Sequence, residues 1–375
     1  MPSRLTKHVN RGRENRRGQQ EDAAVSRSTA IRRSLLAWFR AQARELPWRA
    51  TRDPYAIWLS EIMLQQTQIA TVIPYYHRFL TAFPTVPDLA RAPLERVLEL
   101  WSGLGYYRRA RHLHEAAQVV AAKYQGHFPE DYTTLRTLPG IGDYTARAIL
   151  SIAFDQPYAV LDGNVARVIA RIEARRGNLH EILFRRAVEQ ELAVLLSRRE
   201  PGNFNQAMME LGQTLCLPRS PHCPDCPLSK WCRGHHSGDP EVFPAPRPRR
   251  ATESHHLAVA FLLVGSRVAM VRGLDDGLLA DLWNFPAAFG ASPADARARL
   301  ETKLHQLTRA HFTVGEPVAK FRHGITYRSI QGLVYPVERI TAGMRGHWRW
   351  FELARLPQAA ISQVARKVIE SLSPR

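Results

Sequence analysis

Apolar side chains recur at helical spacing through the first part of the chain. From Ser28 onward, Leu35, Leu36, Trp38 and Phe39 share one face of a predicted helix that ends before the LPWR segment at 46–49. No alternating strand pattern precedes residue 255. The pattern therefore predicts an all-α domain over 29–233. Its further helices lie between Pro and Gly breaks at 54–73, 75–82, 94–102, 108–124, 132–137, 143–153, 162–173, 181–197 and 203–213.

The pattern changes near residue 255. The stretches HLAVAFLLV, RVAMVRG, LWNFPAAF and TYRSIQGLVYPVERI read as strands, with helices at 293–306 and 358–372. Residues 255–375 are therefore predicted to form an α/β domain. The preceding stretch, 234–254, is rich in Pro, Gly and Arg, which is typical of an extended linker. Residues 1–28 are Arg-rich without apolar periodicity and predict a disordered basic arm.

Charge narrows the classes of partner. The 375 residues carry 52 Lys and Arg against 34 Asp and Glu, a net charge of +18. This excess favours a polyanionic partner, although a solubilising surface would also explain it. No run approaches the roughly eighteen apolar residues of a membrane span, and the N-terminus lacks the apolar core of a secretory signal. We expect an intracellular protein, cytoplasmic or nucleoid-associated, that binds nucleic acid.

The four cysteines lie together. Cys216, Cys223, Cys226 and Cys232 fall within seventeen residues at C-x6-C-x2-C-x5-C spacing. Disulfides fit poorly with a reducing compartment. Structural zinc sites usually take their ligands from two closely spaced pairs of Cys or His residues separated by a longer loop. Thiolates in one compact loop can instead bind an iron-sulfur cluster. We expect one [4Fe-4S] cluster in an iron-sulfur loop at 216–232, with zinc as the alternative metal.

A glycine-rich turn suggests contact with a nucleic-acid backbone. The segment LPGIGDYTARAIL places Gly140 and Gly142 between two predicted helices. Glycines allow close approach of a ligand, and the N-H groups at the start of the second helix can bind a phosphate. A helix-hairpin-helix over 132–153 is expected, the alternative being an ordinary helical hairpin.

Two carboxyl groups suggest a reaction. Glu61 lies among Trp, Leu, Ile and Met, so burial would raise its pKa and keep it protonated, unless it is exposed. Asp162 stands at a helix start, where an N-cap is the alternative role. Cleavage of an N-glycosidic bond needs an acid for the departing base and an anion near C1′. The base must first leave the duplex, and Gln66 and Tyr106 are candidates to fill the gap, although Tyr106 could belong to the core.

These segments resemble the MutY family of adenine DNA glycosylases, within the endonuclease III superfamily. The motifs LPWR, WLSEIMLQQTQ, GLGYY, LPGIGDYTA, LDGNV and FNQAMMELG run in order to the cysteine loop over about 46–232, and LWNFP fits the family's C-terminal Nudix-like domain. The resemblance implies that Glu61 protonates N7 of a flipped adenine and that Asp162 stabilises the oxocarbenium ion. It assigns Asn164 and Tyr144 to orienting the acid and the sugar. Residues implied to line the pocket or intercalate are Arg49, Leu64, Gln66, Thr67 and Tyr106.

Tyr144 bears on the reaction's outcome. Bifunctional relatives such as endonuclease III carry a Schiff-base lysine at this point, and a phenol cannot form that imine. The resemblance therefore implies a monofunctional glycosylase that leaves an abasic site. Its expected substrate is double-stranded DNA in which adenine is paired with 8-oxoguanine or guanine. We expect a monomer.

The C-terminal domain departs from the family pattern. Where the family often has a Phe-Ser-His loop that senses 8-oxoguanine, this chain has FRHGITYRSI, with Thr326 and Tyr327 in place of Ser and His. Thr326 keeps a hydroxyl, but the imidazole is lost, which leaves the strength of 8-oxoguanine discrimination open. The stretch RARLETKLHQL offers a single Glu301 where active Nudix hydrolases carry a Glu-rich motif. We expect a lesion-recognition module without hydrolase activity.

Overall fold

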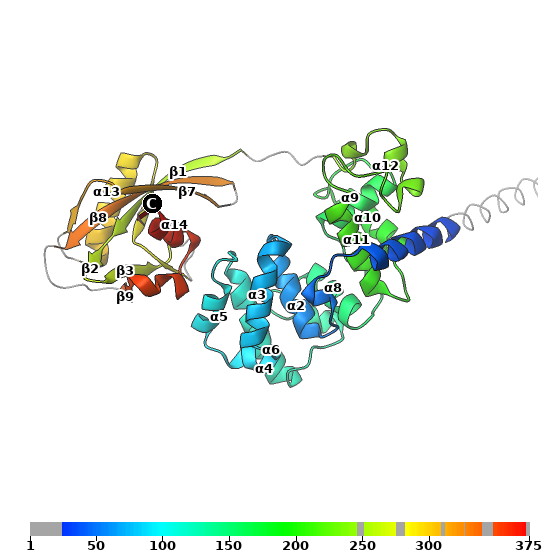
Figure 1. The fold of residues 1–375 in the computed structure, drawn as a ribbon, viewed down its shortest axis with the longest axis horizontal. Helices are drawn as coiled ribbons and strands as arrows, with labels where there is room; N and C mark the ends of the chain where they lie inside the picture. The colour runs from blue at the N-terminus through cyan, green and yellow to red at the C-terminus, as the bar shows by residue number, and fades with distance from the viewer. Residues whose placement is uncertain are drawn as a thin grey trace, which may run out of the picture. The chain divides into compact units, whose positions relative to one another are not determined.

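The computed structural model describes residues 25–245, 251–274, 282–308, 312–325, 327–339 and 348–372. The chain divides into two units, Met1–Gln65 with Ala122–Pro248 and Gln66–Ala121 with Arg249–Arg375. Figure 1 labels most of their helices and strands. Most of the predicted basic arm lies outside the described residues. Its predicted end at residue 28 is wrong, because the first helix already covers 25–42.

The first unit is helical. Its first helix, 25–42, buries most of the apolar face that the sequence predicts, since Leu35, Leu36 and Phe39 are at most 8% exposed and Trp38 is partly buried. This face shares an apolar core with three later helices. They are α9 (Gly163–Ile172), α10 (Ile182–Leu195) and α11 (Pro201–Thr214), which contribute side chains that include Val168, Val188 and Met208.

The remaining elements of the first unit carry the predicted motifs. Asp53 accepts hydrogen bonds from two backbone N-H groups at the start of α2, where Pro54 occupies the first helical position. Gly142 precedes α8, and Asp162 caps α9. These elements are η1 (Pro47–Arg49), α2 (Pro54–Leu64), α7 (Tyr132–Arg136), α8 (Asp143–Ala153), η2 (Ser229–Trp231), α12 (Arg233–His236) and η3 (Pro240–Val242).

The helical part of the second unit corrects two predicted boundaries. It comprises α3 (Ile69–Ala82), α4 (Val86–Arg91), α5 (Leu94–Trp101) and α6 (Arg108–Tyr124). The single helix predicted at 54–73 is two helices, because the chain turns at 65–68, where Gln66 adopts a φ of 57°. The break predicted before residue 75 is absent, since α3 continues through Pro74 and forgoes one backbone hydrogen bond there.

The C-terminal part is an α/β region with two sheets. One sheet has the order β5-β1-β8-β6, with β7 also paired to β8; among its described strand pairs, β1 and β8 are parallel and the others antiparallel. The other has the order β2-β3-β4, with β9 paired to β3. The strands are β1 (Glu253–Phe261), β2 (Leu263–Val264), β3 (Arg267–Arg272), β4 (Trp283–Asn284), β5 (Ala287–Gly290), β6 (Phe312–Val314), β7 (Ala319–Ile325), β8 (Arg328–Arg339) and β9 (Trp348–Glu352).

Alternating residues of β1 face two different helices. Leu257 and Val259 belong to the core that includes Val364 of α14 (Gln363–Leu372), whereas Ala258 and Ala260 pack with Leu300 of α13 (Pro293–Thr308). The short helix η5 (Leu353–Gln358) precedes α14. Helices therefore cover both faces of this sheet, as the near-continuous apolar run in the sequence requires.

The predicted linker at 234–254 is too long at both ends. Phe243 is 5% exposed in the core of the first unit, and the Ala245 N-H donates to the Gly177 carbonyl oxygen at 2.8 Å. Residues 234–245 therefore pack on the helical unit, and β1 already begins at Glu253. The Pro- and Gly-rich composition predicted a linker, but the buried Phe243 side chain fixes this stretch on the helical unit. In the described ranges, no helix is both long and apolar enough to cross a membrane.

Candidate active site

Glu61 is buried on α2. Every residue from Tyr55 to Met63 is buried, and Glu61 itself is 7% exposed. Burial raises the pKa of its carboxyl to about 7; a hydrogen bond from Tyr144 lowers it, and the charge of Asp162 raises it further. The exposed alternative is therefore wrong. A carboxyl with this pKa keeps its proton in about half of the molecules at neutral pH, and this protonated form can donate it.

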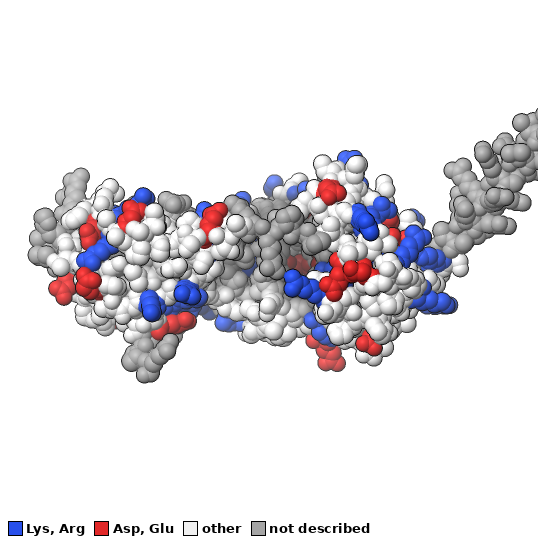
Figure 2. Space-filling model, turned by 90° about the horizontal axis from the view of Figure 1, so that it is seen from above, with Lys and Arg blue, Asp and Glu red and all other residues white. Residues whose placement is uncertain are grey.

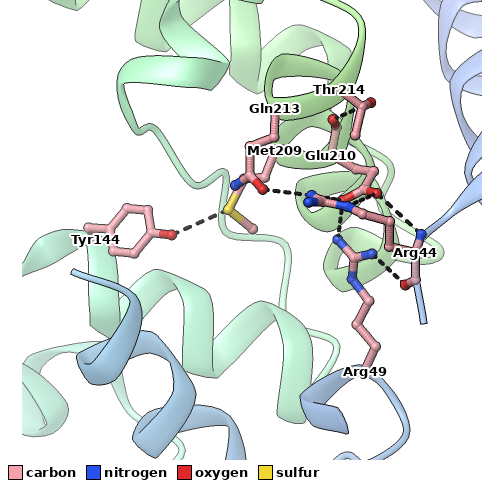
Figure 3. A network of polar contacts seen from close by, with 7 residues as sticks. All are labelled: Arg44, Arg49, Tyr144, Met209, Glu210, Gln213 and Thr214. Atoms are coloured by element: carbon pink, nitrogen blue, oxygen red, sulfur yellow. Dashed lines mark hydrogen bonds and ion pairs between the residues drawn. The ribbon is translucent and has the colours of Figure 1, made fainter. Parts of the chain in front are cut away.

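Tyr144, on α8, lies close to Glu61. Burial and the nearby carboxylates raise the pKa of the Tyr144 phenol well above its ordinary value, so the hydroxyl stays protonated. Its oxygen lies 3.3 Å from the Met209 sulfur, toward which it points in Figure 3. The phenol has one proton, so the sulfur and the Glu61 carboxyl compete for it.

Asp162 caps α9 and also lies close enough to Glu61 to affect its pKa. Its Oδ1 accepts from the Val165 N-H at 2.7 Å, which caps α9, and its Oδ2 accepts from Asn164 Nδ2 at 3.1 Å. Its charge also acts on Glu61. The N-cap role is confirmed, and it does not exclude a chemical one, because the capping bond fixes the carboxylate beside the acid.

Arg167 links this site to the cysteine loop. Its Nη2 donates to Asn164 Oδ1 at 2.9 Å and to the Gly212 carbonyl oxygen at 2.7 Å, and its Nε donates to the Cys216 carbonyl oxygen at 2.8 Å. A Cβ on Gly212 would lie 2.7 Å from the Asn164 Cβ. Close approach of α11 to α9 therefore holds Asn164 in place.

Arg49 belongs to an ion-pair network around the buried Glu210 (Figure 3). Its Nη2 lies 2.8 Å from Glu210 Oε2, and Arg44 Nε lies 2.6 Å from Glu210 Oε1. Although burial opposes ionisation, the two guanidinium groups lower the pKa of Glu210 to about 2. Glu210 is not among the site residues that the sequence predicts; its one signal is a carboxylate among the apolar residues of FNQAMMELG.

The glycine turn has the expected helical neighbours. Gly140 adopts a φ of 74°, which favours glycine, and Gly142 precedes the first turn of α8. A Cβ on Gly142 would meet no atom within 4 Å, so the backbone there is open to approach. The segment α7-turn-α8 thus has the form of a helix-hairpin-helix.

The residues expected to enter DNA come from both units. In the first unit, Leu64 ends α2 and is partly buried. In the second unit, Gln66 is exposed with a φ of 57°, and Thr67 Oγ1 accepts from Arg109 at 3.1 Å. Tyr106, also in the second unit, is 47% exposed with a φ of 48°, so it is not a core residue.

The four cysteines line one small cavity. Arg171 of α9 holds the loop: its guanidinium lies 3.4 Å from Cys216 Sγ and donates to the Leu217 carbonyl oxygen at 2.6 Å. Burial and the neighbouring cysteines raise the pKa of Cys226 to about 12, despite an opposing backbone hydrogen bond. Within the described ranges, no set of three His, Cys, Asp or Glu side chains has the arrangement of a single-ion site. The predicted cluster stays a prediction.

The C-terminal contacts are only partly described. Thr326 lies outside the described residues. Tyr327 lies in the turn between β7 and β8, where its carbonyl oxygen accepts from the Glu253 N-H at 2.9 Å. Figure 2 shows basic and acidic side chains interspersed on the face in view. The charge excess does not form a single patch there.

The chain is similar to known DNA glycosylases along most of its length. The HhH-GPD superfamily of base excision DNA repair proteins matches residues 59–193. The adenine DNA glycosylase of Homo sapiens is 36% identical, covering 92% of this chain and 74% of that protein. The adenine DNA glycosylase of Arabidopsis thaliana is 38% identical, covering 75% of this chain and 51% of that protein. A thermostable thymine-DNA glycosylase structure is 29% identical with a TM-score of 0.52, covering 56% of this chain and 98% of that one.

Proposed function

Because this chain belongs to the adenine DNA glycosylase family, we propose that it removes adenine paired with 8-oxoguanine or guanine and leaves an abasic site. The observation that carries the chemistry is the buried Glu61 beside Asp162. The human adenine enzyme is 36% identical over 92% of this chain, C-terminal region included, whereas the thymine-DNA glycosylase is 29% identical and 98% of its length matches only 56% of this chain. This difference favours adenine over thymine.

The two carboxyl groups have separate roles in the reaction. The protonated form of Glu61, which its raised pKa keeps populated at neutral pH, donates its proton to N7 of the extruded adenine, and the base leaves as a neutral molecule. Asp162 supplies the negative charge that stabilises the oxocarbenium ion at C1′ until water adds. Asn164 orients Asp162 through the 3.1 Å hydrogen bond, and Tyr144 orients Glu61.

The reaction ends at the abasic site. Strand cleavage by a bifunctional glycosylase requires an amine that forms an imine with the sugar. Tyr144 supplies a phenol with a raised pKa in the position that the family resemblance assigns to that amine. We therefore expect hydrolysis without formation of a covalent enzyme-DNA intermediate.

The cysteine loop is proposed to hold a [4Fe-4S] cluster. The four cysteines line one cavity, and thiolates are the ligands such clusters use. Cys216, Cys223, Cys226 and Cys232 would hold it. When bound, the cluster would supply structural cross-links that fix the loop. Arg171 and Arg167 would then connect that loop to α9, which begins just after Asp162.

The C-terminal domain is proposed to read the base opposite the adenine. Its sheet covered by α13 and α14 is compatible with a Nudix-like domain. The sequence stretch FRHGITYRSI, which contains Thr326 and Tyr327, corresponds by resemblance to the family's lesion-sensing loop. The loss of the imidazole leaves the hydroxyls of Thr and Tyr as the polar groups for this contact.

A panel of duplexes tests the proposal. Adenine is placed opposite 8-oxoguanine or guanine, thymine opposite guanine, and thymine glycol opposite adenine, each under single-turnover conditions followed by alkali. We expect alkali-labile sites at adenine only, with intact strands before alkali and no product trapped by borohydride. Absence of cleavage at adenine would contradict the adenine assignment, and efficient borohydride trapping would contradict the monofunctional one.

A further inference from the structure

The loop at 102–107, which joins α5 to α6 and carries Tyr106, is bound by a C-terminal segment of the same unit, 361–366. Arg366 Nη2 donates to Ser102 Oγ at 2.6 Å, and Gln363 Nε2 donates to the Gly103 carbonyl oxygen at 3.3 Å. The buried Tyr107 hydroxyl donates to the Ile361 carbonyl oxygen at 3.3 Å. Three hydrogen bonds thus join α14 and the residues before it to this loop.

The loop has a conformation that depends on such support. Gly103, Gly105 and Tyr106 have φ values of 110°, 74° and 48°. A Cβ on Gly103 would lie 1.9 Å from the Tyr75 hydroxyl oxygen, so only glycine fits there. Tyr106 is not a glycine, and a left-handed conformation at such a residue persists only where surrounding contacts hold it.

Arg109 supports the loop from the helical side. Its Nη2 lies 3.3 Å from the Leu104 carbonyl oxygen and 3.2 Å from that of Gly105, and its guanidinium carbon is 5.4 Å from the centre of the Tyr106 ring. The same Nη2 donates to Thr67. The loop is therefore held by the helical part on one side and by 361–366 on the other, while the Tyr106 side chain remains exposed.

We propose that segment 361–366 positions the Tyr106 loop for insertion into the duplex, so that the C-terminal domain acts on base extrusion itself. This inference rests on the proposed function in one respect, the entry of Tyr106 into DNA. Because the contacts are made to Ser102, Gly103 and Tyr107, their effect does not depend on the base opposite the adenine. The segment is a positioning element, distinct from the lesion-sensing turn.

The test removes the contacts and follows extrusion directly. The double variant Gln363→Ala/Arg366→Ala is mixed with duplexes carrying fluorescent 2-aminopurine in place of adenine, opposite guanine or 8-oxoguanine. Loss of two hydrogen bonds predicts extrusion slower by about fivefold to thirtyfold, equally for both opposite bases. Lys367→Ala is the matched control, because its Nζ donates to the Arg322 carbonyl oxygen within the C-terminal part and its removal is expected to leave extrusion unchanged.

Combination with Tyr106→Ala separates this inference from the proposed function. If the segment acts through Tyr106, the triple variant is no slower than Tyr106→Ala alone. Full additivity, or slowing only opposite 8-oxoguanine, would overturn the inference while leaving the proposed function intact. Normal extrusion by Tyr106→Ala would reject the intercalation role and the inference with it. Ser102→Ala removes the Arg366 contact from the opposite side and is expected to slow extrusion even if the double variant folds poorly.

Discussion

At the residue scale, Glu61 loses its proton less readily in the folded chain than in the unfolded one. Its pKa is about 7 when folded, against an ordinary value of 4.5. The folded chain therefore binds this proton more tightly, and stability falls as pH rises from about 4.5 to about 7. Above neutral pH, burial of the ionised Glu61 carboxylate therefore lowers the free energy of unfolding.

The variant Glu61→Gln should lack this pH-dependent loss of stability. The amide cannot ionise, so the free energy of unfolding of the variant minus that of the wild type should rise by up to about 3 kcal/mol between pH 5 and pH 8. Denaturant unfolding at the two pH values measures the difference, with Glu45→Gln as an exposed control. The variant should also lose excision. A difference independent of pH would argue against a raised Glu61 pKa.

The variant Asp162→Asn should separate the role of Asp162 in capping α9 from its proposed role in stabilising the oxocarbenium ion. The amide oxygen can still accept from the Val165 N-H, so α9 should persist, whereas the negative charge at C1′ is lost. We expect single-turnover excision slower by about 100-fold or more with nearly unchanged duplex affinity. Asp131→Asn, at the cap of α7, is the matched control. Equal loss of affinity and excision would indicate a structural role alone.

At the element scale, the approach of α11 to α9 holds Asn164. Gly212→Ala places a Cβ 2.7 Å from the Asn164 Cβ, so the helices must separate. We expect unfolding to be easier by about 1–3 kcal/mol and excision to slow as Asn164 shifts. Thermal unfolding and single-turnover rates measure both effects. Gly324→Ala is the control, because its Cβ would meet no atom within 4 Å; unchanged rates in Gly212→Ala would contradict the role of this contact.

Helical periodicity predicted most helices, because their apolar faces repeat in sequence. It failed where single residues decide: the turn at Gln66 divides one predicted helix, Pro74 does not end another, and Phe243 anchors part of the predicted linker. The motifs also located Glu61 and Asp162. The Glu210 network was missed, because its partners Arg44 and Arg49 lie more than 160 residues away in sequence.

At the scale of the whole molecule, Arg167 of α9 connects the cysteine loop to Asn164, and Asn164 contacts Asp162. If a [4Fe-4S] cluster fixes that loop, the purified protein should contain about four irons per chain and absorb near 400 nm. Cys226→Ser should lower the iron content and the excision rate together. Zinc in place of iron, or full activity in iron-free protein, would contradict the cluster.

Adenine removal is proposed to depend on the protonated form of Glu61. The most direct test of this dependence is the single-turnover release of free adenine from an A·8-oxoguanine duplex between pH 5 and pH 9. We predict release that slows above about pH 7, approaching tenfold for each pH unit, because only protonated Glu61 donates to N7. No release of adenine, or a rate that does not change across this range, would contradict the account.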